Sequence, residues 1–183
     1  MQFITFIHEF LKNPKSIGAI SPSSKKLTKK MLETISFEQA ECIIELGPGT
    51  GSFTMELIKK KKPLTKLILI DNNAVFCEKL RRQLAYEPNV EVIHGSAENL
   101  CLYMDELHIK KIDYIVSGLP FTSLSPIVSA SILQNIRTCM EDGEFITFQY
   151  SLVRKSLIQQ FFDRISHTKV WMNIPPAYVL RCK

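Results

Sequence analysis

The sequence lacks the cysteine patterns of disulfide-rich and zinc-binding proteins. Its five cysteines are an odd number, and no two of them form a Cys-x-x-Cys arrangement. Paired, regularly spaced cysteines are typical of disulfide frameworks and of structural zinc sites. We therefore expect no disulfide framework, no metal site and a reducing compartment. The five are Cys42, Cys77, Cys101, Cys139 and Cys182.

Long hydrophobic runs are also missing. No apolar stretch reaches the ~18 residues that a membrane-spanning helix needs. The first residues lack the basic and apolar regions of a secretory signal, so we expect a cytoplasmic protein. Apolar residues make up 45% of the 183 residues and charged residues 22%, which suits one compact domain and excludes a largely disordered chain.

The net charge of +5 is confined to the start of the chain. Residues 1–32 hold six lysines and a single acid, Glu9, whereas the remaining residues carry basic and acidic side chains in equal number. Such a segment favours an anionic partner, either a membrane surface or a nucleic acid. A solvated face that only keeps the protein soluble is the alternative. The lysines are Lys12, Lys15, Lys25, Lys26, Lys29 and Lys30.

Hydrophobic periodicity predicts two helices followed by an alternation of strands and helices. Apolar side chains recur at helical spacing over residues 2–12, and Ser21-Pro22 is typical of the start of a second helix that runs to about Ile35. Further helices are expected over 52–61, 74–84, 100–107, 126–140 and 154–162. Strands are expected at 42–46, 67–70, 90–94, 112–116, 144–150, 168–173 and 177–181.

This alternation predicts an α/β fold of the Rossmann-like kind. We expect a seven-stranded, mostly parallel sheet with helices on both faces and the N-terminal helices added to it. Only residues 174–176 separate the last two strands, and a link that short cannot cross over between parallel strands. The last strand is therefore expected to be antiparallel. We assign 1–36 to the N-terminal helices and 37–183 to the main domain.

A glycine-rich loop, Glu45–Gly51, follows the first predicted strand. Glycines let a backbone approach a ligand closely, and ligands of such sheets bind beyond the carboxyl ends of the strands. The G-x-G-x-G spacing is neither the dinucleotide fingerprint nor a nucleotide P-loop. Glu45 would repel a pyrophosphate but suits a cationic amino acid moiety. Asp71 ends the second strand, where an acid binds ribose hydroxyls.

These residues resemble the cofactor loop of class I methyltransferases. The resemblance implies S-adenosyl-L-methionine as the cofactor and S-adenosyl-L-homocysteine as the product. It implies that the glycines line the cofactor, that Glu45 faces its methionine end and that Asp71 holds the ribose. The residues so implied around this loop are Glu45, Gly47, Gly49, Thr50, Gly51, Asp71, Asn72 and Ser117.

A second segment, His94–Glu98, resembles the loop of the same enzymes that meets the adenine. Ser96 stands where an aspartate is usual, and Ala97 follows it. Glu98 is the alternative contact for the adenine.

The segment Ser117–Phe121 follows the fourth predicted strand, where amine methyltransferases of class I keep the motif that orients the substrate. It resembles the Asn-Leu-Pro-Tyr/Phe motif of ribosomal RNA adenine dimethylases, but Gly118 stands at the Asn position. An adenine amine is a poor nucleophile because its lone pair is delocalised, and the Asn carbonyl helps to localise it. Gly118 lacks that group, and we expect no C-terminal helical domain like theirs.

An alkylamine needs less help. Its lone pair reacts once the ammonium has lost a proton with a pKa of about 10, which leaves desolvation and positioning to the protein. Aromatic faces hold the methylated, cationic head well. Phe121 and Tyr150 are candidates for that contact, with ordinary core packing as the alternative. Ser117 and Tyr150 are candidate bases beside a backbone carbonyl or water, and Leu119 completes the candidate catalytic residues.

Several segments together resemble the bacterial phospholipid N-methyltransferases. The resemblance implies methylation of phosphatidylethanolamine, in up to three steps, by a protein held peripherally at the inner face of the membrane. Residues 1–32 would form its basic amphipathic anchor and carry the membrane binding, with the folded domain contributing little. The segments are Phe10–Pro14, Ile17–Ile20, Ser23-Ser24, Glu45–Gly51, Ser117–Phe121, Phe148–Ser151 and Asn173–Ala177.

Other functions stay open at this point. The basic segment also suits an rRNA adenine N6-methyltransferase, although the missing Asn makes a nucleic acid partner less favoured. A methyltransferase for a small soluble amine and a non-catalytic module that binds S-adenosylmethionine are further alternatives. The first helix could also pack on the domain as a lid instead of acting as an anchor.

Overall fold

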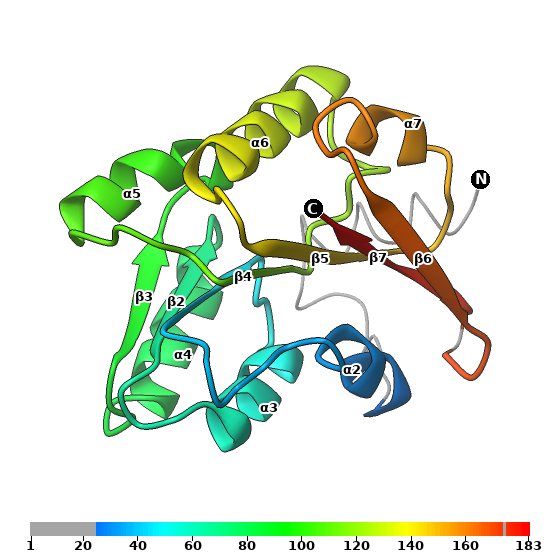
Figure 1. Cartoon of the computed structure of the whole chain (residues 1–183). Coiled ribbons are helices and arrows are strands. Elements are labelled where there is room, and N and C mark those ends of the chain that lie inside the picture. Colours follow the sequence, from blue (N-terminus) through cyan, green and yellow to red (C-terminus); the bar gives the residue numbers. More distant parts are fainter. Residues whose placement is uncertain (1–24, 174) are drawn as a thin grey trace.

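The computed structural model describes residues 25–173 and 175–183, and within them one seven-stranded sheet forms the centre of the molecule. The strands lie in the order β3-β2-β1-β4-β5-β7-β6 (Figure 1). The first five are parallel, and β7 is antiparallel to both β5 and β6, as predicted. Their bounds are β1 Cys42–Leu46, β2 Lys66–Asp71, β3 Val90–His94, β4 Tyr114–Ser117, β5 Glu144–Gln149, β6 Ile165–Val170 and β7 Ala177–Cys182.

Helices cover both faces of the sheet, which confirms the expected layering. One face packs on α2 (Lys25–Met31), α3 (Ser52–Lys60) and α4 (Ala74–Gln83). The other packs on α5 (Leu100–Glu106), α6 (Pro126–Cys139) and α7 (Lys155–Ile158), with the 3-10 helix η1 (Ala97–Asn99) before α5. Ile43 and Ile44 are both fully buried, one in each core, because side chains alternate across a strand.

Several predicted elements have other bounds in the structure, and some predictions fall outside it: the second helix ends at Met31 instead of about Ile35, and β4 begins two residues later than expected. Strand β6 begins at Ile165, three residues before the predicted start, because its polar side chains at an edge of the sheet give no apolar signal. Helix α7 is shorter than the pattern over 154–162 predicts. The predicted helix 2–12 and the cap at Ser21 lie outside the described residues. From residue 25 on, the N-terminal unit packs on the sheet through the buried Leu27 and Met31.

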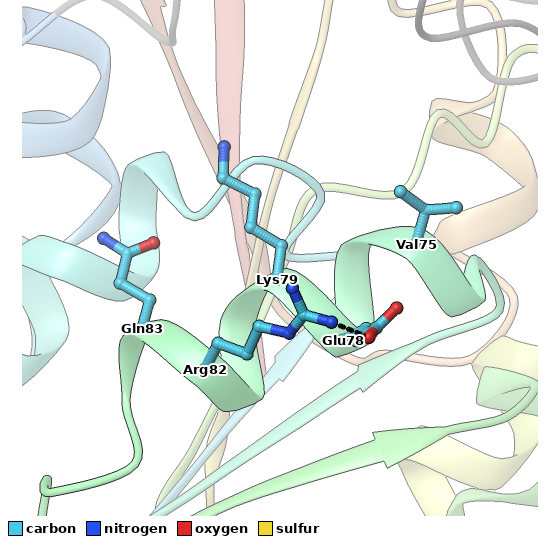
Figure 2. Close-up of a pocket in the computed structure, with 5 residues that line it drawn as sticks. All are labelled: Val75, Glu78, Lys79, Arg82 and Gln83. Carbon is cyan, nitrogen blue, oxygen red and sulfur yellow. Dashed lines mark hydrogen bonds and ion pairs between the residues drawn. The ribbon is translucent and has the colours of Figure 1, made fainter.

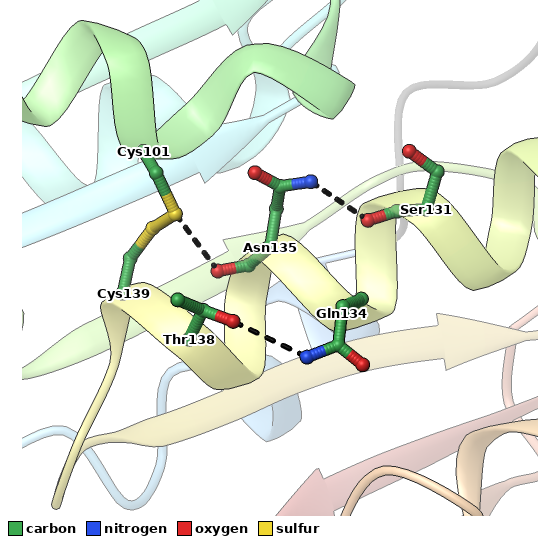
Figure 3. The surroundings of a disulfide bond; sticks show 6 residues. All are labelled: Cys101, Ser131, Gln134, Asn135, Thr138 and Cys139. Carbon is green, nitrogen blue, oxygen red and sulfur yellow. Dashed lines mark hydrogen bonds between the residues drawn. A yellow bond between two sulfur atoms is a disulfide. The ribbon is translucent and has the colours of Figure 1, made fainter.

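The expectation that no disulfide forms is wrong. Cys101 in α5 and Cys139 in α6 form a disulfide, with their Cα atoms 5.7 Å apart (Figure 3). The two residues are 38 positions apart in sequence and meet only because α5 packs against α6, which the spacing of cysteines does not reveal. The remaining cysteines, Cys42, Cys77 and Cys182, are buried thiols.

The disulfide predicts the thiol content of the protein purified without reductant. In denaturant, three thiols per chain should react before reduction and five after it. Opening a covalent loop of this length should lower the free energy of unfolding by about 2–4 kcal/mol, as measured by urea denaturation with and without reductant. Cys139→Ser should match the reduced wild type in stability. Five reactive thiols in the unreduced protein would contradict the pairing.

Candidate functional site

The predicted site residues converge at one edge of the sheet. Leu46, the last residue of β1, is paired with Ile70 of β2 and with Ser117 of β4. The glycine loop, the end of β2 and the segment after β4 therefore leave the sheet side by side. This is the carboxyl edge, where ligands of open α/β sheets bind.

The glycine loop has a conformation that favours glycine at three positions. Gly47, Gly49 and Gly51 have φ angles of 68°, 54° and 87°, which a side chain strains. A Cβ atom at Gly49 would meet nothing within 4 Å, so the backbone there borders open space. A ligand can thus approach the peptide groups of the loop closely.

Asp71 fixes the loop to the end of β2. Its Oδ2 accepts a hydrogen bond from the Gly49 N–H at 3.0 Å, and its Oδ1 accepts one from the Asn73 N–H at 2.8 Å. Burial raises the pKa of Asp71, and these two bonds oppose the rise. Each carboxylate oxygen has a second lone pair, so the group can still accept from hydroxyls. The predicted neighbour Asn72 is exposed, and Asn73 instead caps α4.

Glu45 is a fully buried carboxyl group that is only half satisfied. Its Oε2 accepts a hydrogen bond from the Thr54 hydroxyl at 2.7 Å. Its Oε1 is buried without a hydrogen-bond partner among the described residues. Burial raises the pKa of Glu45 to about 8; the hydrogen bond from Thr54 opposes the rise, and the charge of Asp71 adds to it. A cationic ligand group would satisfy this carboxylate, which fits the ammonium of a methionine moiety.

The adenine segment forms a capped turn. Ser96 accepts a hydrogen bond from the Glu98 N–H at 3.2 Å, and its hydroxyl lies 3.3 Å from Oε2 of Glu98. It thereby caps η1, whose first residue, Ala97, is buried. The serine at the position usual for aspartate thus has a local role in the fold. Contact of Ser96, Ala97 or Glu98 with the adenine stays a prediction.

The segment after β4 is held by polar side chains of β5 that sequence reasoning did not single out. Gln149 donates a hydrogen bond to the carbonyl of Leu119 at 3.1 Å, and Thr147 donates one to the carbonyl of Ser117 at 3.4 Å. Ser117 is buried, and its hydroxyl accepts from the Leu119 N–H. Thr147 and Gln149 are buried polar residues two positions apart in β5, among the apolar Phe145, Ile146 and Phe148. This pattern could have drawn attention to the two residues but not to their partners.

Gly118 lies against the glycine loop. A Cβ atom at Gly118 would stand 2.7 Å from the carbonyl oxygen of Gly47, closer than such contacts occur. A Cβ atom at Gly47 would in turn stand 2.8 Å from Cδ2 of Leu119. This geometry has no room for the Asn side chain that stands at the position of Gly118 in the motif of the adenine dimethylases.

The two aromatic candidates have different surroundings. Phe121 is fully buried and packs edge-on against Phe145, with 6.2 Å between the ring centroids. It is therefore a core residue, which was the alternative to a contact with the substrate. Tyr150 is half-buried at the end of β5 and packs edge-on against Phe148. Burial raises the pKa of Tyr150, and a hydrogen bond with Asn173 opposes the rise. Of the two, Tyr150 is the better placed to face a ligand.

A hollow on the surface of α4 is not part of this site. Its lining residues all come from that one helix, where Glu78 and Arg82 form an exposed ion pair (Figure 2). The hollow contains none of the residues at the strand ends that form the site. Within the described residues no cluster of His, Cys, Asp and Glu could hold a metal ion.

The sequence matches a family of methyltransferases. The family model described as ribosomal RNA adenine dimethylase matches residues 6–165. An ornithine lipid N-methyltransferase of Singulisphaera acidiphila is 27% identical over 99% of this chain and 95% of that protein. An rRNA adenine N-6-methyltransferase of Bacillus licheniformis is 24% identical over 83% of this chain and 53% of that protein. The chain therefore spans about half of the latter relative but nearly all of the former.

Solved structures share the fold. The N-methyltransferase NodS of Bradyrhizobium japonicum, in complex with S-adenosyl-L-homocysteine, has a TM-score of 0.71 at 11% identity and covers 98% of this chain and 96% of that one. A precorrin-6y C5,15-methyltransferase of Geobacter metallireducens has a TM-score of 0.69 at 13% identity and covers 91% and 92%. No helix among the described residues is long and apolar enough to cross a membrane.

The buried carboxyl of Glu45 predicts a specific pH dependence of stability. Between its ordinary pKa of 4.5 and about 8, the folded state keeps a proton that the unfolded state has released. The free energy of unfolding should therefore fall as the pH rises through this window, by at most about 1.4 kcal/mol per pH unit. Urea denaturation of the wild type and of Glu45→Gln, which keeps an acceptor for Thr54, measures it. The difference in stability should grow with pH in favour of Glu45→Gln, and parallel profiles would refute the burial argument.

Proposed function

Because the chain belongs to the ribosomal RNA adenine dimethylase family, we propose that it applies the chemistry of that family to the alkylamine of a lipid headgroup, phosphatidylethanolamine and its methylated intermediates. The protein is an S-adenosylmethionine-dependent N-methyltransferase, and S-adenosyl-L-methionine is its cofactor. The acceptor and the roles of individual residues are the proposed part.

The contact of Gly118 with Gly47 carries the proposal. An adenine amine needs a side-chain carbonyl to localise its lone pair, and this position lacks both the group and the space for it. An alkylamine, once deprotonated, is nucleophilic without that help. The relative that the chain matches over nearly its full length is named for methylation of an ornithine lipid, which also carries an alkylamine. Both observations favour a lipid amine over a nucleobase.

The residues at the carboxyl edge fit the cofactor. S-adenosyl-L-methionine supplies a methyl group that its sulfonium makes electrophilic. We assign its ammonium to the half-satisfied Glu45, which the positive charge would ionise, and its ribose hydroxyls to Asp71. Thr54 orients Glu45, and the open backbone at Gly49 lets the cofactor approach.

The substrate side is built from the segment after β4 and the end of β5. Gln149 holds the Leu119 carbonyl and Thr147 the Ser117 carbonyl, so this backbone is fixed before a substrate arrives. The raised pKa of Tyr150 keeps its phenol protonated at neutral pH, which makes it an aromatic contact for a methylated head and not a base. The amine proton would then pass to a backbone carbonyl, to water or to Ser117.

Membrane attachment through residues 1–32 is the second part of the proposal. Of this segment the structure describes α2 onward, where Lys25, Lys26 and Lys29 are exposed. Lys30 instead pairs with Glu33 at 2.6 Å. Exposed lysines on a segment that otherwise lies outside the described residues are consistent with attraction to anionic lipids. The inner face of the membrane is the place we propose for the enzyme.

The assignment of Asp71 predicts a loss of cofactor affinity. Asp71→Ala removes the acceptor for the ribose and releases the Gly49 N–H, so binding of S-adenosyl-L-homocysteine should weaken by about 1–3 kcal/mol. Calorimetric titration measures it, with Asp105→Ala on the exposed face of α5 as the matched control. Unchanged affinity in a folded Asp71→Ala protein would remove Asp71 from the site.

The acceptor is tested by a parallel transfer assay with labelled cofactor. The assay offers phosphatidylethanolamine in vesicles, ribosomal RNA, ornithine lipid and soluble ethanolamine as acceptors. We expect methylation of phosphatidylethanolamine and none of ribosomal RNA. Gly118→Asn should lower lipid methylation by at least about tenfold, because its Cβ forces the two loops apart, and should gain no activity on adenine. Methylation of RNA with no transfer to any lipid amine would reverse the proposal.

A further inference from the structure

The loop between β6 and β7 lies at the same edge of the sheet as the site. Gln149 at the end of β5 is paired with Tyr178 of β7, and Val170 of β6 with Ala177 of β7. The hairpin therefore turns at the carboxyl ends of the parallel strands. In Figure 1 it extends, in orange and red, beside the blue helix α2, which packs against both strands.

The tip of this hairpin exposes two large apolar side chains next to each other. Trp171 is 70% exposed and Met172 is 66% exposed. An exposed indole leaves apolar surface in water, and aromatic rings of this amphipathic kind are enriched where proteins meet the headgroup level of membranes. Neighbouring exposed apolar residues at a hairpin tip thus point to a surface that is covered in use.

Two lysines flank these side chains. The ammonium group of Lys169 lies 3.5 Å from the centroid of the Trp171 ring. The ammonium group of Lys26, in α2, lies 2.7 Å from the sulfur of Met172. Apolar tips with cations beside them complement an anionic bilayer, where the ring and thioether enter the interface and the lysines meet phosphates.

We propose that Trp171, Met172, Lys26 and Lys169 form a docking surface for an anionic membrane. The proposal rests on the lipid acceptor proposed above. It goes beyond the charge map of the sequence, because only Lys26 of the four residues lies within residues 1–32, where that map places the membrane contact. Docking here would turn the carboxyl edge toward the headgroups. Asn173, buried directly after the tip, is hydrogen-bonded to Tyr150, so the tip is held next to the proposed substrate side.

Trp171 is the single tryptophan of the chain, so its fluorescence reports on this surface alone. The full-length protein is mixed with vesicles of phosphatidylethanolamine and phosphatidylglycerol, and separately with phosphatidylcholine vesicles. We expect a blue shift of the emission and quenching by brominated acyl chains with the anionic vesicles only. An RNA oligonucleotide is the third arm. Quenching by RNA and not by vesicles would overturn the proposal in favour of a nucleic acid surface.

Lys26 belongs both to this surface and to residues 1–32, so the variants of Lys169 and Trp171 are the ones that separate the surface from the N-terminal segment. Lys26→Glu and Lys169→Glu should each weaken partitioning to anionic vesicles by about tenfold. Trp171→Ala should also weaken it, by several-fold in flotation. The matched controls are Lys110→Glu and Tyr86→Ala, two exposed residues in loops that precede β4 and β3 at the opposite edge. They should partition like the wild type.

These experiments test the docking surface separately from the proposed lipid acceptor. The variant Phe6→Glu places a charge on the apolar stripe predicted for residues 2–12. If the protein floats with vesicles while its tryptophan emission is unchanged, and Phe6→Glu alone abolishes flotation, the hairpin surface is refuted although lipid methylation can stand. If the emission shifts and the variants behave as expected, but no lipid amine is methylated, the docking surface stands and the proposed acceptor falls.

Discussion

The backbone of Gly118 against the carbonyl of Gly47 is the contact on which the site depends. It exists because β1 and β4 are neighbours in the sheet, so the loops that follow them leave at the same level. At this contact backbone lies against backbone, and beside it the side chain of Leu119 packs on Gly47. The hydrogen bonds from Thr147 and Gln149 then hold the segment after β4 from the far side. The cofactor loop and the substrate loop thus lie in direct contact, and this unit is tied to β5.

The buried carboxyl groups behind this unit explain how a cation can be selected. Glu45 and Asp71 lie close enough for the charge of one to raise the pKa of the other. With its pKa raised to about 8, Glu45 keeps its proton at neutral pH when no ligand is bound. A neutral donor could satisfy the unpartnered Oε1, but only a positively charged ligand also offsets the cost of ionising Glu45 beside Asp71.

The sequence predicts the fold and the cofactor side of the site because both follow from local patterns. The periodicity of apolar residues predicts the strands of the sheet. Because ligands of such sheets bind at the ends of the strands, Glu45, the glycines and Asp71 are predicted to lie at one edge. Thr54, Thr147 and Gln149 could not be assigned in this way, since their partners come from other elements. The same holds for Phe121, whose place in the core depends on Phe145, and for the disulfide, which depends on how α5 packs on α6.

The disulfide has a topological consequence. The segment from Cys101 to Cys139 contains β4 and the whole loop Ser117–Phe121, so the substrate loop is part of a covalently closed ring. A protease that cuts the exposed stretch at residues 125–127 would release no fragment, because both halves stay tethered through sulfur. Such a nicked molecule keeps its two pieces covalently joined until the disulfide is reduced, while its substrate loop stays attached to the chain through β4 alone.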